Sequence, residues 1–398
     1  MDEGIFSKVM LASEQKLAEA AQYPNRRYLY ETVSNAPKEY CVGVYGLRGI
    51  GKTIMLLQQA RAAEKALYIS ADAIYLKDEP LYGMLDHARK KGYRSIFVDE
   101  INSKPGWEAD LKTFYDEGGA RIFFTGSSAI ELRKGADLSR RVLLYHMKPL
   151  SFREYIIMKR GLAGFSPIPF ESLFSADACR EAATRHSALS AHLHEFFALG
   201  GIFHPGGAGD KEYAYASLSN VLEKIIHHDL AYLREIDVGI ENAVLAILKR
   251  IALSSSYEVN FSRLSENLSI SKPTVIRIVD DLARIGVVMK VPPCFAQVRK
   301  EPKLFLAFPF RSFFAEMLGA KPDIGTLREE FFASHVDGIC HLKGKRGERT
   351  PDFMYKGKKV EVGGAGKGAS RQNPDFVLRE EVVFGDKSIP LFLAGFNY

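Results

Sequence analysis

A glycine-rich octapeptide, Gly46-Leu-Arg-Gly-Ile-Gly-Lys-Thr53, limits what this chain can fold into more than any other stretch. It follows an apolar run at residues 40–45 and precedes a helix-like segment at residues 54–60. Glycines let successive backbone N–H groups curl around an anion, and a helix that starts directly afterwards adds a favourable dipole. Strand, glycine loop and helix in this order therefore indicate a phosphate-binding loop rather than a chance glycine-rich turn.

The side chains at the end of the loop have the chemistry that a bound nucleotide requires. Lys52 is expected to reach the β- and γ-phosphates, and the hydroxyl of Thr53 is expected to bind Mg²⁺. ATP and Mg²⁺ are therefore the expected cofactors. The residues that we expect around the nucleotide are Gly46, Gly49, Ile50, Gly51, Lys52, Thr53 and Ile54.

A buried strand predicted at residues 95–98 delivers two carboxylates, Asp99 and Glu100, at its C-terminal end. Ligands bind at that end of the strands in open α/β sheets. Asp99 is expected to hold Mg²⁺ through its water shell, and Glu100 is expected to polarise the attacking water. Acids also suit a solvated strand end, but after a phosphate-binding loop the pair favours the catalytic interpretation.

Two further stretches supply candidates for contact with the γ-phosphate. The apolar run at residues 121–124 ends in hydroxyls, of which Thr125 or Ser127 could lie between the acidic pair and the phosphate. A turn that caps the next helix explains these hydroxyls nearly as well. Arg140 or Arg141 could stabilise charge developing on the γ-phosphate, in cis or from a neighbouring subunit. The alternative is a solvated pair of arginines before a strand.

Apolar runs at residues 66–69, 95–98, 121–124 and 142–145 alternate with helical stretches. A parallel sheet requires such helical crossovers, and its buried strands read as continuous apolar runs. The alternation therefore predicts an α/β fold in which helices cover both faces of a parallel sheet.

Composition limits the function classes. A chain of 398 residues favours about two to four domains. Its 54 basic and 48 acidic residues give a net charge of +6, which permits contact with nucleic acid without requiring it. The four cysteines are widely spaced, so they fit a reducing compartment and exclude a zinc ribbon. No apolar run approaches a membrane span and the N-terminus lacks signal-peptide features, so we expect a cytoplasmic protein without a membrane partner.

The motifs from the glycine loop to residue 154 resemble those of the prokaryotic AAA-type ATPases. Besides the loop, the resemblance is carried by Val98-Asp-Glu-Ile101, Trp107, Thr125-Gly-Ser-Ser128, Leu138-Ser-Arg-Arg141 and Pro149-Leu-Ser-Phe-Arg-Glu154. The last motif is the most specific for a narrower group that carries a winged helix and a C-terminal restriction-endonuclease-like domain. In that group a glycine usually precedes the finger arginine, whereas Ser139 precedes Arg140 here, which leaves both arginines as candidates.

The resemblance covers nearly the whole chain and implies five parts. Their expected bounds are 1–39 for an N-terminal helix and connector, 40–150 for the P-loop ATPase core, 151–240 for a helical lid, 241–307 for a winged helix, and 308–398 for a small α+β nuclease-like domain. We expect the last of these to be degenerate.

The pattern in the fourth part predicts a helix that starts at Ser271 and stops at Gly286. Apolar residues before and within this helix predict a helix-turn-helix core. Residues 286–291 and 303–306 are expected to pair as a hairpin, the wing of the winged helix.

This predicted winged helix is compatible with two kinds of partner. Asp280 and Asp281 on its exposed side would repel phosphate, so a structural or protein-docking role is as well supported as DNA binding. In a version that reads DNA, the groove-facing residues would be Ser271, Lys272, Thr274 and Arg277.

A second candidate site lies near the C-terminus. By resemblance to restriction-endonuclease metal sites, Glu329 on a helix and Asp352 and Glu361 on adjacent strands would hold Mg²⁺. The lysine of that pattern lies two residues after the strand glutamate, where this chain has Gly363, and Lys367 is the substitute candidate. The incomplete set favours an inactive nuclease-like domain, and a hairpin with solvated charges is the alternative.

We therefore predict an ATP-binding and ATP-hydrolysing switch of AAA type, coupled to double-stranded DNA or to a protein partner and able to form homo-oligomers. The first alternative is an ATP-licensed, metal-dependent endonuclease, against which the missing lysine at position 363 counts. The second alternative is a scaffold that binds ATP without hydrolysing it, against which the intact Glu100 counts.

Overall fold

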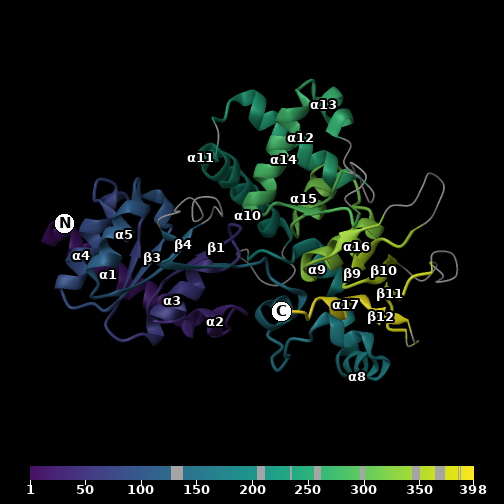
Figure 1. Ribbon diagram of the computed structural model, residues 1–398, viewed down its shortest axis with the longest axis horizontal. Helices are drawn as coiled ribbons and strands as arrows, with labels where there is room; N and C mark the ends of the chain where they lie inside the picture. Colours follow the sequence, from purple (N-terminus) through teal and green to yellow (C-terminus); the bar gives the residue numbers. More distant parts are fainter. Residues whose placement is uncertain are drawn as a thin grey trace. The chain divides into compact units, whose positions relative to one another are not determined.

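The structure is a computed structural model of the chain, and it describes residues 1–126, 138–203, 211–233, 235–254, 261–295, 301–342, 350–363, 373–383, 385 and 387–398. The chain divides into two compact units, Met1–Lys148 and Pro149–Tyr398. Figure 1 shows their elements, coloured along the sequence. The finer division into five parts stays a prediction.

A five-stranded parallel sheet forms the centre of the first unit, in the order β2-β3-β4-β1-β5. Its strands are β1 (Cys41–Tyr45), β2 (Ala66–Ser70), β3 (Ser95–Asp99), β4 (Arg121–Gly126) and β5 (Val142–His146). This sheet confirms the predicted parallel α/β fold. Because β1 lies between β4 and β5 and is buried along its whole length, the glycine loop leaves the sheet from an interior strand.

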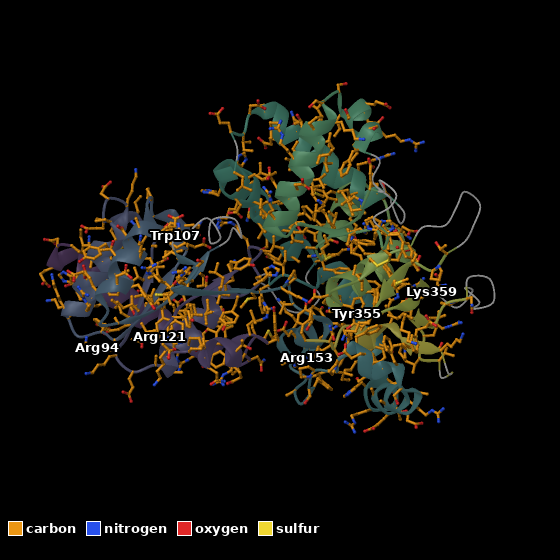
Figure 2. All side chains as sticks on the ribbon, in the orientation of Figure 1. Arg94, Trp107, Arg121, Arg153, Tyr355 and Lys359 are labelled. Carbon is orange, nitrogen blue, oxygen red and sulfur yellow. A yellow bond between two sulfur atoms is a disulfide. The ribbon has the colours of Figure 1, made fainter. Side chains whose placement is uncertain are left out.

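Helices pack on this sheet through their apolar sides. They are α1 (Glu3–Glu19), α2 (Tyr30–Ser34), α3 (Lys52–Ala62), α4 (Leu81–Lys90) and α5 (Trp107–Glu117), with short 3₁₀ turns at Ala20–Gln22, Ile74–Leu76 and Ile101–Ser103. Phe6, Leu85 and Trp107 bring α1, α4 and α5 into one hydrophobic core with the strands, and Figure 2 labels Trp107. α3 packs against β2, β3 and β4, so the helix after the glycine loop lies on the strands that carry the other predicted site residues.

The second unit begins with a helix whose start is fixed by its own side chains. The hydroxyl of Ser151 accepts the N–H of Glu154 at 3.2 Å, and the Glu154 carboxylate accepts the N–H of Ser151 at 3.2 Å. This capping box satisfies two N–H groups that the first helical turn leaves unpaired. It gives a local structural reason for the Ser-Phe-x-Glu spacing at residues 151–154.

The second unit is otherwise rich in helices. They are α7 (Phe152–Arg160), α8 (Ala176–His186), α9 (Leu193–Leu199), α10 (Lys211–Lys224), α11 (Ala231–Leu233), α12 (Val238–Leu253), α13 (Phe261–Leu268), α14 (Lys272–Ile285), α15 (Phe310–Met317), α16 (Ile324–His335) and α17 (Leu391–Ala394), with 3₁₀ turns at Phe170–Phe174 and Ser187–His192 and a π-helical turn at Ile225–Leu230. Among the helices that the structure describes, none is long and apolar enough to cross a membrane.

A second sheet lies near the C-terminus, in the order β12-β11-β10-β9-β8. Its strands are β8 (Cys340–His341), β9 (Phe353–Tyr355), β10 (Lys358–Gly363), β11 (Phe376–Arg379) and β12 (Ser388–Pro390). The pairs β8–β9 and β9–β10 are antiparallel, whereas β10–β11 and β11–β12 are parallel. With α16 packed on β10, this forms the α+β region expected after residue 308.

The helices that follow residue 151 share one hydrophobic core with this C-terminal sheet. Phe152 of α7 and Phe196 of α9 pack edge-on against Phe331 of α16 at centroid distances of 5.9 and 5.5 Å. The guanidinium of Arg153, labelled in Figure 2, donates a 3.0 Å hydrogen bond to the carbonyl of Tyr398. The first helices of the predicted lid and the predicted C-terminal domain therefore belong to one body.

Three helices and a hairpin lie between α9 and α16 in the sequence, besides other elements. α12, α13 and α14 are followed by β6 (Val288–Val291) and β7 (Lys303–Leu306), which pair antiparallel as predicted. The predicted bounds of α14 are confirmed: the Ser271 hydroxyl accepts the N–H of Thr274, and Gly286 ends the helix with a left-handed φ of 95°.

The expectation that the cysteines fit a reducing compartment, where disulfides are rare, is wrong in one respect. Cys294 and Cys340 form a disulfide with an S–S distance of 2.13 Å. A backbone hydrogen bond brings the two segments together beside the disulfide: the N–H of Cys294 donates to the carbonyl of His341 at 3.1 Å. The sequence gives no spacing signal for it, since the two cysteines are separated by 46 positions.

Candidate nucleotide-binding site

The glycine loop joins β1 to α3 with backbone conformations that require glycine. Gly46 has a φ of 154°, and a Cβ there would lie 2.3 Å from the carbonyl oxygen of Met147. Gly51 has a φ of 92° and precedes α3 without any side-chain cap on the first helical turn. A glycine at this position offers no side chain to cap the helix, which is the local arrangement of a phosphate-binding loop.

The ammonium of Lys52 lies over the loop. Its Nζ donates hydrogen bonds to the carbonyl oxygens of Gly46 at 3.0 Å and Leu47 at 2.9 Å. The side chain is buried, so the positive charge is held inside the curve of the loop. Its predicted contact with the phosphates stays a prediction, and the structure places this cation beside the glycine loop at the start of α3.

Asp99 is held by hydroxyl groups from three elements. Its Oδ2 accepts hydrogen bonds from Thr53 of α3 at 2.8 Å and from Tyr68 of β2 at 3.0 Å, and its Oδ1 accepts one from Thr125 of β4. The carboxylate is buried, and these hydrogen bonds replace those it would make to water. The structure therefore brings Thr53, Asp99 and Thr125, three of the predicted site residues, into direct contact.

Glu100 follows in a strained backbone conformation. Its φ of 51° is left-handed, and its N–H donates to the Thr125 hydroxyl at 3.2 Å. Its carboxylate lies 3.9 Å from the guanidinium of Arg48, a residue of the glycine loop. The turn that Thr125 fixes thus points Glu100 back toward the loop, where an attacking water would have to be oriented.

The two candidate arginines have different surroundings. Arg141 forms a bidentate ion pair with Asp116, with Nε–Oδ1 at 2.7 Å and Nη2–Oδ2 at 3.0 Å, and these hydrogen bonds lower the pKa of Asp116 below its ordinary value. Arg140 is exposed and has no polar partner among the residues that the structure describes. Ser127, the alternative to Thr125, lies outside the described residues.

Sequence reasoning missed Tyr68, Arg48 and Arg27 as neighbours of the site. Tyr68 sits within an apolar strand, and the usable signal was that a buried phenol needs a hydrogen-bond acceptor. Burial, and after it the Asp99 carboxylate, raise the pKa of Tyr68 above its ordinary value, so it stays a donor. The signals for Arg48 and Arg27 lie only in distant contacts, which no local pattern reveals.

The C-terminal candidates do not complete a metal site. Glu329 is buried on α16, and the ammonium of Lys303 from β7 lies 3.1 Å from its carboxylate. Asp352 accepts the N–H of Val362 at 2.9 Å. Glu361 lies next to it across the β9–β10 ladder, one position beyond the pair of Val360 and Phe353.

These residues do not fit a bound divalent cation. Within the described part of the chain, no group of three or more His, Cys, Asp or Glu side chains is placed to hold a metal ion. The cation beside Glu329 is the Lys303 ammonium. Lys367 lies outside the described residues, so its predicted role is not tested.

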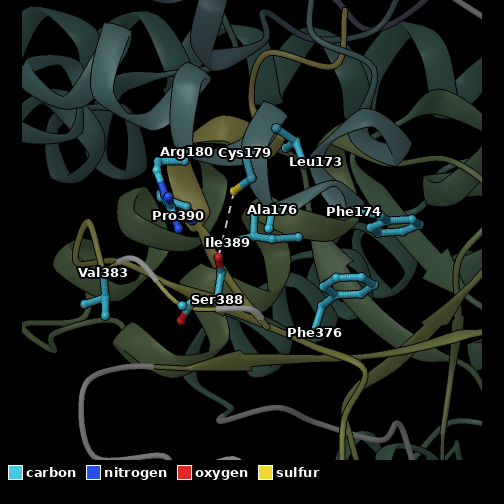
Figure 3. A pocket seen from close by; sticks show the side chains of 11 residues that line it. Leu173, Phe174, Ala176, Cys179, Arg180, Phe376, Val383, Ser388, Ile389 and Pro390 are labelled. Carbon is cyan, nitrogen blue, oxygen red and sulfur yellow. Dashed lines mark hydrogen bonds between the residues drawn. The ribbon is translucent and has the colours of Figure 1, made fainter.

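A small hollow in the second unit offers no chemistry of its own. Figure 3 shows apolar side chains around it, including Phe174 and Phe376, whose rings stack at 4.5 Å. The Cys179 thiol donates to the carbonyl of Ser388 at 3.8 Å, and burial raises the pKa of this thiol. A protonated, buried thiol is a poor nucleophile, so we regard this hollow as part of the core.

The polar side chains at the start of α14 bond within the chain. The Ser271 hydroxyl contacts the Thr274 hydroxyl at 2.8 Å, and Lys272 donates to Ser262 at 3.0 Å. Arg277 lines a shallow, mixed-charge groove whose other lining residues include Asp280. Three of the four residues predicted to face DNA, namely Ser271, Lys272 and Thr274, thus bond within the chain.

Two stretches of the chain match known protein families. Residues 38–156 match a family described as an AAA domain, and residues 197–307 match a family described as a domain of unknown function. An uncharacterised protein of Methanocaldococcus jannaschii, MJ1637, is 29% identical over 384 residues, which cover 85% of this chain and 78% of that protein.

Solved structures are more distant. The Aeropyrum pernix ORC1 protein in complex with DNA is 14% identical, with 76% of this chain and 92% of that chain covered and a TM-score of 0.29. A Thermotoga maritima RuvB variant is 12% identical, with 71% and 89% covered and a TM-score of 0.29. AMPPCP-bound DnaA from Aquifex aeolicus is 13% identical, with 64% and 84% covered and a TM-score of 0.26. Likenesses this distant bear on neither the activity nor the partner. From the family match and the site geometry, we conclude that residues 38–156 belong to an AAA-type domain.

Proposed function

We propose that this protein binds and hydrolyses Mg-ATP in its first unit and acts as a molecular switch. The observation that carries the proposal is the 2.8 Å hydrogen bond between the Thr53 hydroxyl and Asp99, at the open N-terminus of α3. It joins the two oxygen-bearing side chains that would hold the metal. Mg²⁺, when bound, neutralises charge on the β- and γ-phosphates.

Each neighbouring side chain has a role in this proposal. Lys52 exchanges the loop carbonyls for phosphate oxygens, which are stronger acceptors for an ammonium. Glu100 orients the attacking water, and Thr125 fixes the turn that carries Glu100. Arg140 is the better candidate for contact with the γ-phosphate, because Arg141 is committed to Asp116. Whether Arg140 acts in its own subunit or on a neighbouring copy depends on oligomer formation.

We favour a protein as the partner over double-stranded DNA. In the proposed winged helix, the start of α14 is engaged within the chain, and Asp280 lines the same groove as Arg277. Asp281, predicted to lie on the exposed side, is instead buried and pairs with Arg284 at 3.4 Å. Lys290 of the wing strand is paired with Asp280 at 2.5 Å, which removes one more cation that phosphate would need. A docking role uses this surface without requiring positive charge.

The proposal is tested by steady-state ATP hydrolysis with and without double-stranded DNA. Wild-type protein should hydrolyse ATP, Lys52→Ala should not, and DNA should leave the rate unchanged. Absence of both binding and hydrolysis in the wild type would refute the ATPase. Stimulation by DNA that Arg277→Ala removes would replace the protein partner with DNA.

We further propose that the C-terminal region does not cleave nucleic acid. Glu329 is paired with Lys303, and the lysine position after Glu361 is occupied by Gly363. Purified protein should show no Mg²⁺-dependent cleavage of plasmid DNA, with or without ATP. Cleavage that Glu361→Ala abolishes would establish the endonuclease instead.

A further inference from the structure

A buried arginine in the segment before α2 contacts the glycine loop from outside. Arg27 is 4% exposed and belongs to no motif. Its Nη1 donates to the carbonyl of Ile50, inside the loop, and its Nη2 donates to the carbonyl of Lys148 at 2.7 Å. One guanidinium therefore bridges the glycine loop and the last residue of the first unit.

The next residue strengthens this bridge. The hydroxyl of Tyr28 donates to the carbonyl of His146 at 3.1 Å and accepts the N–H of Lys148 at 3.1 Å. The loop itself touches the same segment, since Gly46 leaves no room for a Cβ against the Met147 carbonyl. Residues 146–148 thus pack against the glycine loop.

The contact with Ile50 has a consequence for anion binding. The Ile50 carbonyl and the Gly51 N–H belong to the same planar, trans peptide group, so they point in opposite directions. A guanidinium that holds the carbonyl on one side therefore directs the Gly51 N–H to the other side. A charge-assisted hydrogen bond to the carbonyl also polarises the peptide and makes its N–H a stronger donor.

We propose that Arg27 is a positioning residue for the nucleotide: it orients and polarises the Ile50–Gly51 peptide for a phosphate and ties the loop to Lys148. This inference rests on the proposed ATP binding. A buried arginine that serves stability alone would also satisfy its donors, so the two roles must be separated by how the protein responds to nucleotide.

The neighbouring arginine supplies a matched control. Arg26 is exposed, stacks over Tyr30 at 4.0 Å and pairs with Glu31 at 3.0 Å. Arg26→Met removes the same charge one position away without touching the loop. Arg27→Lys keeps the charge at the buried site, but a single ammonium replaces the two-armed contact with Ile50 and Lys148.

The experiment measures Mg-ATP affinity by calorimetry on the full chain, and thermal unfolding with and without Mg-ATP. Arg27→Met should weaken ATP binding by about tenfold or more, the effect of one charge-assisted hydrogen bond. Its nucleotide-induced rise in Tm should shrink accordingly. Arg27→Lys should fall between wild type and Arg27→Met, and Arg26→Met should stay within about twofold of wild type.

A purely structural role gives a different result. Arg27→Met would then lower Tm equally with and without nucleotide and keep wild-type affinity, which would overturn the inference. If Arg27→Met does not fold, wild-type affinity in Arg27→Lys overturns it instead. Failure of the wild type itself to bind ATP would refute the proposed function, and Lys52→Ala gives the non-binding reference that separates these cases.

Discussion

Thr53 and Asp99, which lie on different elements and far apart in the sequence, are joined by a 2.8 Å hydrogen bond from hydroxyl to carboxylate. The contact forms because α3 packs against β3, whose last residue is Asp99. Tyr68 and Thr125 complete the donors around the same carboxylate. These contacts fix the position of the carboxylate for which we propose a role in holding Mg²⁺.

Replacing Asp99 by asparagine tests the metal role. The amide keeps the shape of the carboxylate but lacks its charge, so it attracts Mg²⁺ and its water shell less. We expect Asp99→Asn to lower kcat by about a hundredfold or more, and to shift the Mg²⁺ dependence of ATP hydrolysis to higher concentration. A Mg²⁺ titration of the rate measures both effects, and an unchanged titration curve would contradict the assignment.

Glu100→Gln tests the proposed water-orienting role. A glutamine cannot act as a base, and loss of general base catalysis typically costs about 10²–10⁴-fold in rate. ATP binding should be kept, since the role proposed for Glu100 is to orient water and not to bind phosphate. Single-turnover hydrolysis and calorimetric affinity, measured on the same preparation, separate these effects. Equal losses of affinity and rate would show that Glu100 acts in binding.

From the buried setting of Tyr68, we predict a loss of folding stability at alkaline pH. Its pKa is raised above the ordinary value of 10.0, chiefly by burial, so the folded state keeps the phenol proton where the unfolded state releases it. The stabilisation that comes from keeping the Tyr68 phenol protonated is complete below about pH 10. It is lost as the pH rises above the pKa of Tyr68 in the unfolded state. Tyr68→Phe should unfold in urea with a shallower pH dependence above pH 10. An identical pH dependence in both proteins would exclude the effect.

Lys303→Met tests the buried pair near the C-terminal sheet. Removing the ammonium leaves a buried charged carboxylate without that cation, which typically costs about 3–5 kcal/mol in the free energy of unfolding. The double variant Lys303→Met with Glu329→Leu should recover much of this loss, because it removes both charges of the pair. Urea unfolding measures both. Wild-type stability in Lys303→Met would mean that Glu329 does not depend on this ammonium.

Much of the first unit could be predicted because its signals are local. The glycine loop and the acidic pair at the end of β3 each occupy one short stretch, and parallel strands bring their C-terminal ends to one edge. The bounds of α14 followed from Ser271 and Gly286, which act within one helical turn. In each case a few consecutive residues decided the structure.

The remainder depends on contacts between distant residues. Arg27 and Tyr68 find their partners through strand order and through the path of residues 146–148, which no local pattern encodes. Lys303 belongs to a hairpin that sequence reasoning treated apart from Glu329. The Cys294–Cys340 disulfide likewise joins segments that only the folded chain brings together.

The most direct test of the central claim is calorimetric titration of ATP into the purified protein, with Mg²⁺ and with a chelator. The account predicts Mg²⁺-dependent binding of one ATP per chain that Lys52→Ala weakens by about a hundredfold, since a buried charge-assisted contact with phosphate is lost. Binding by Lys52→Ala with wild-type affinity, or no binding by the wild type at all, would contradict it.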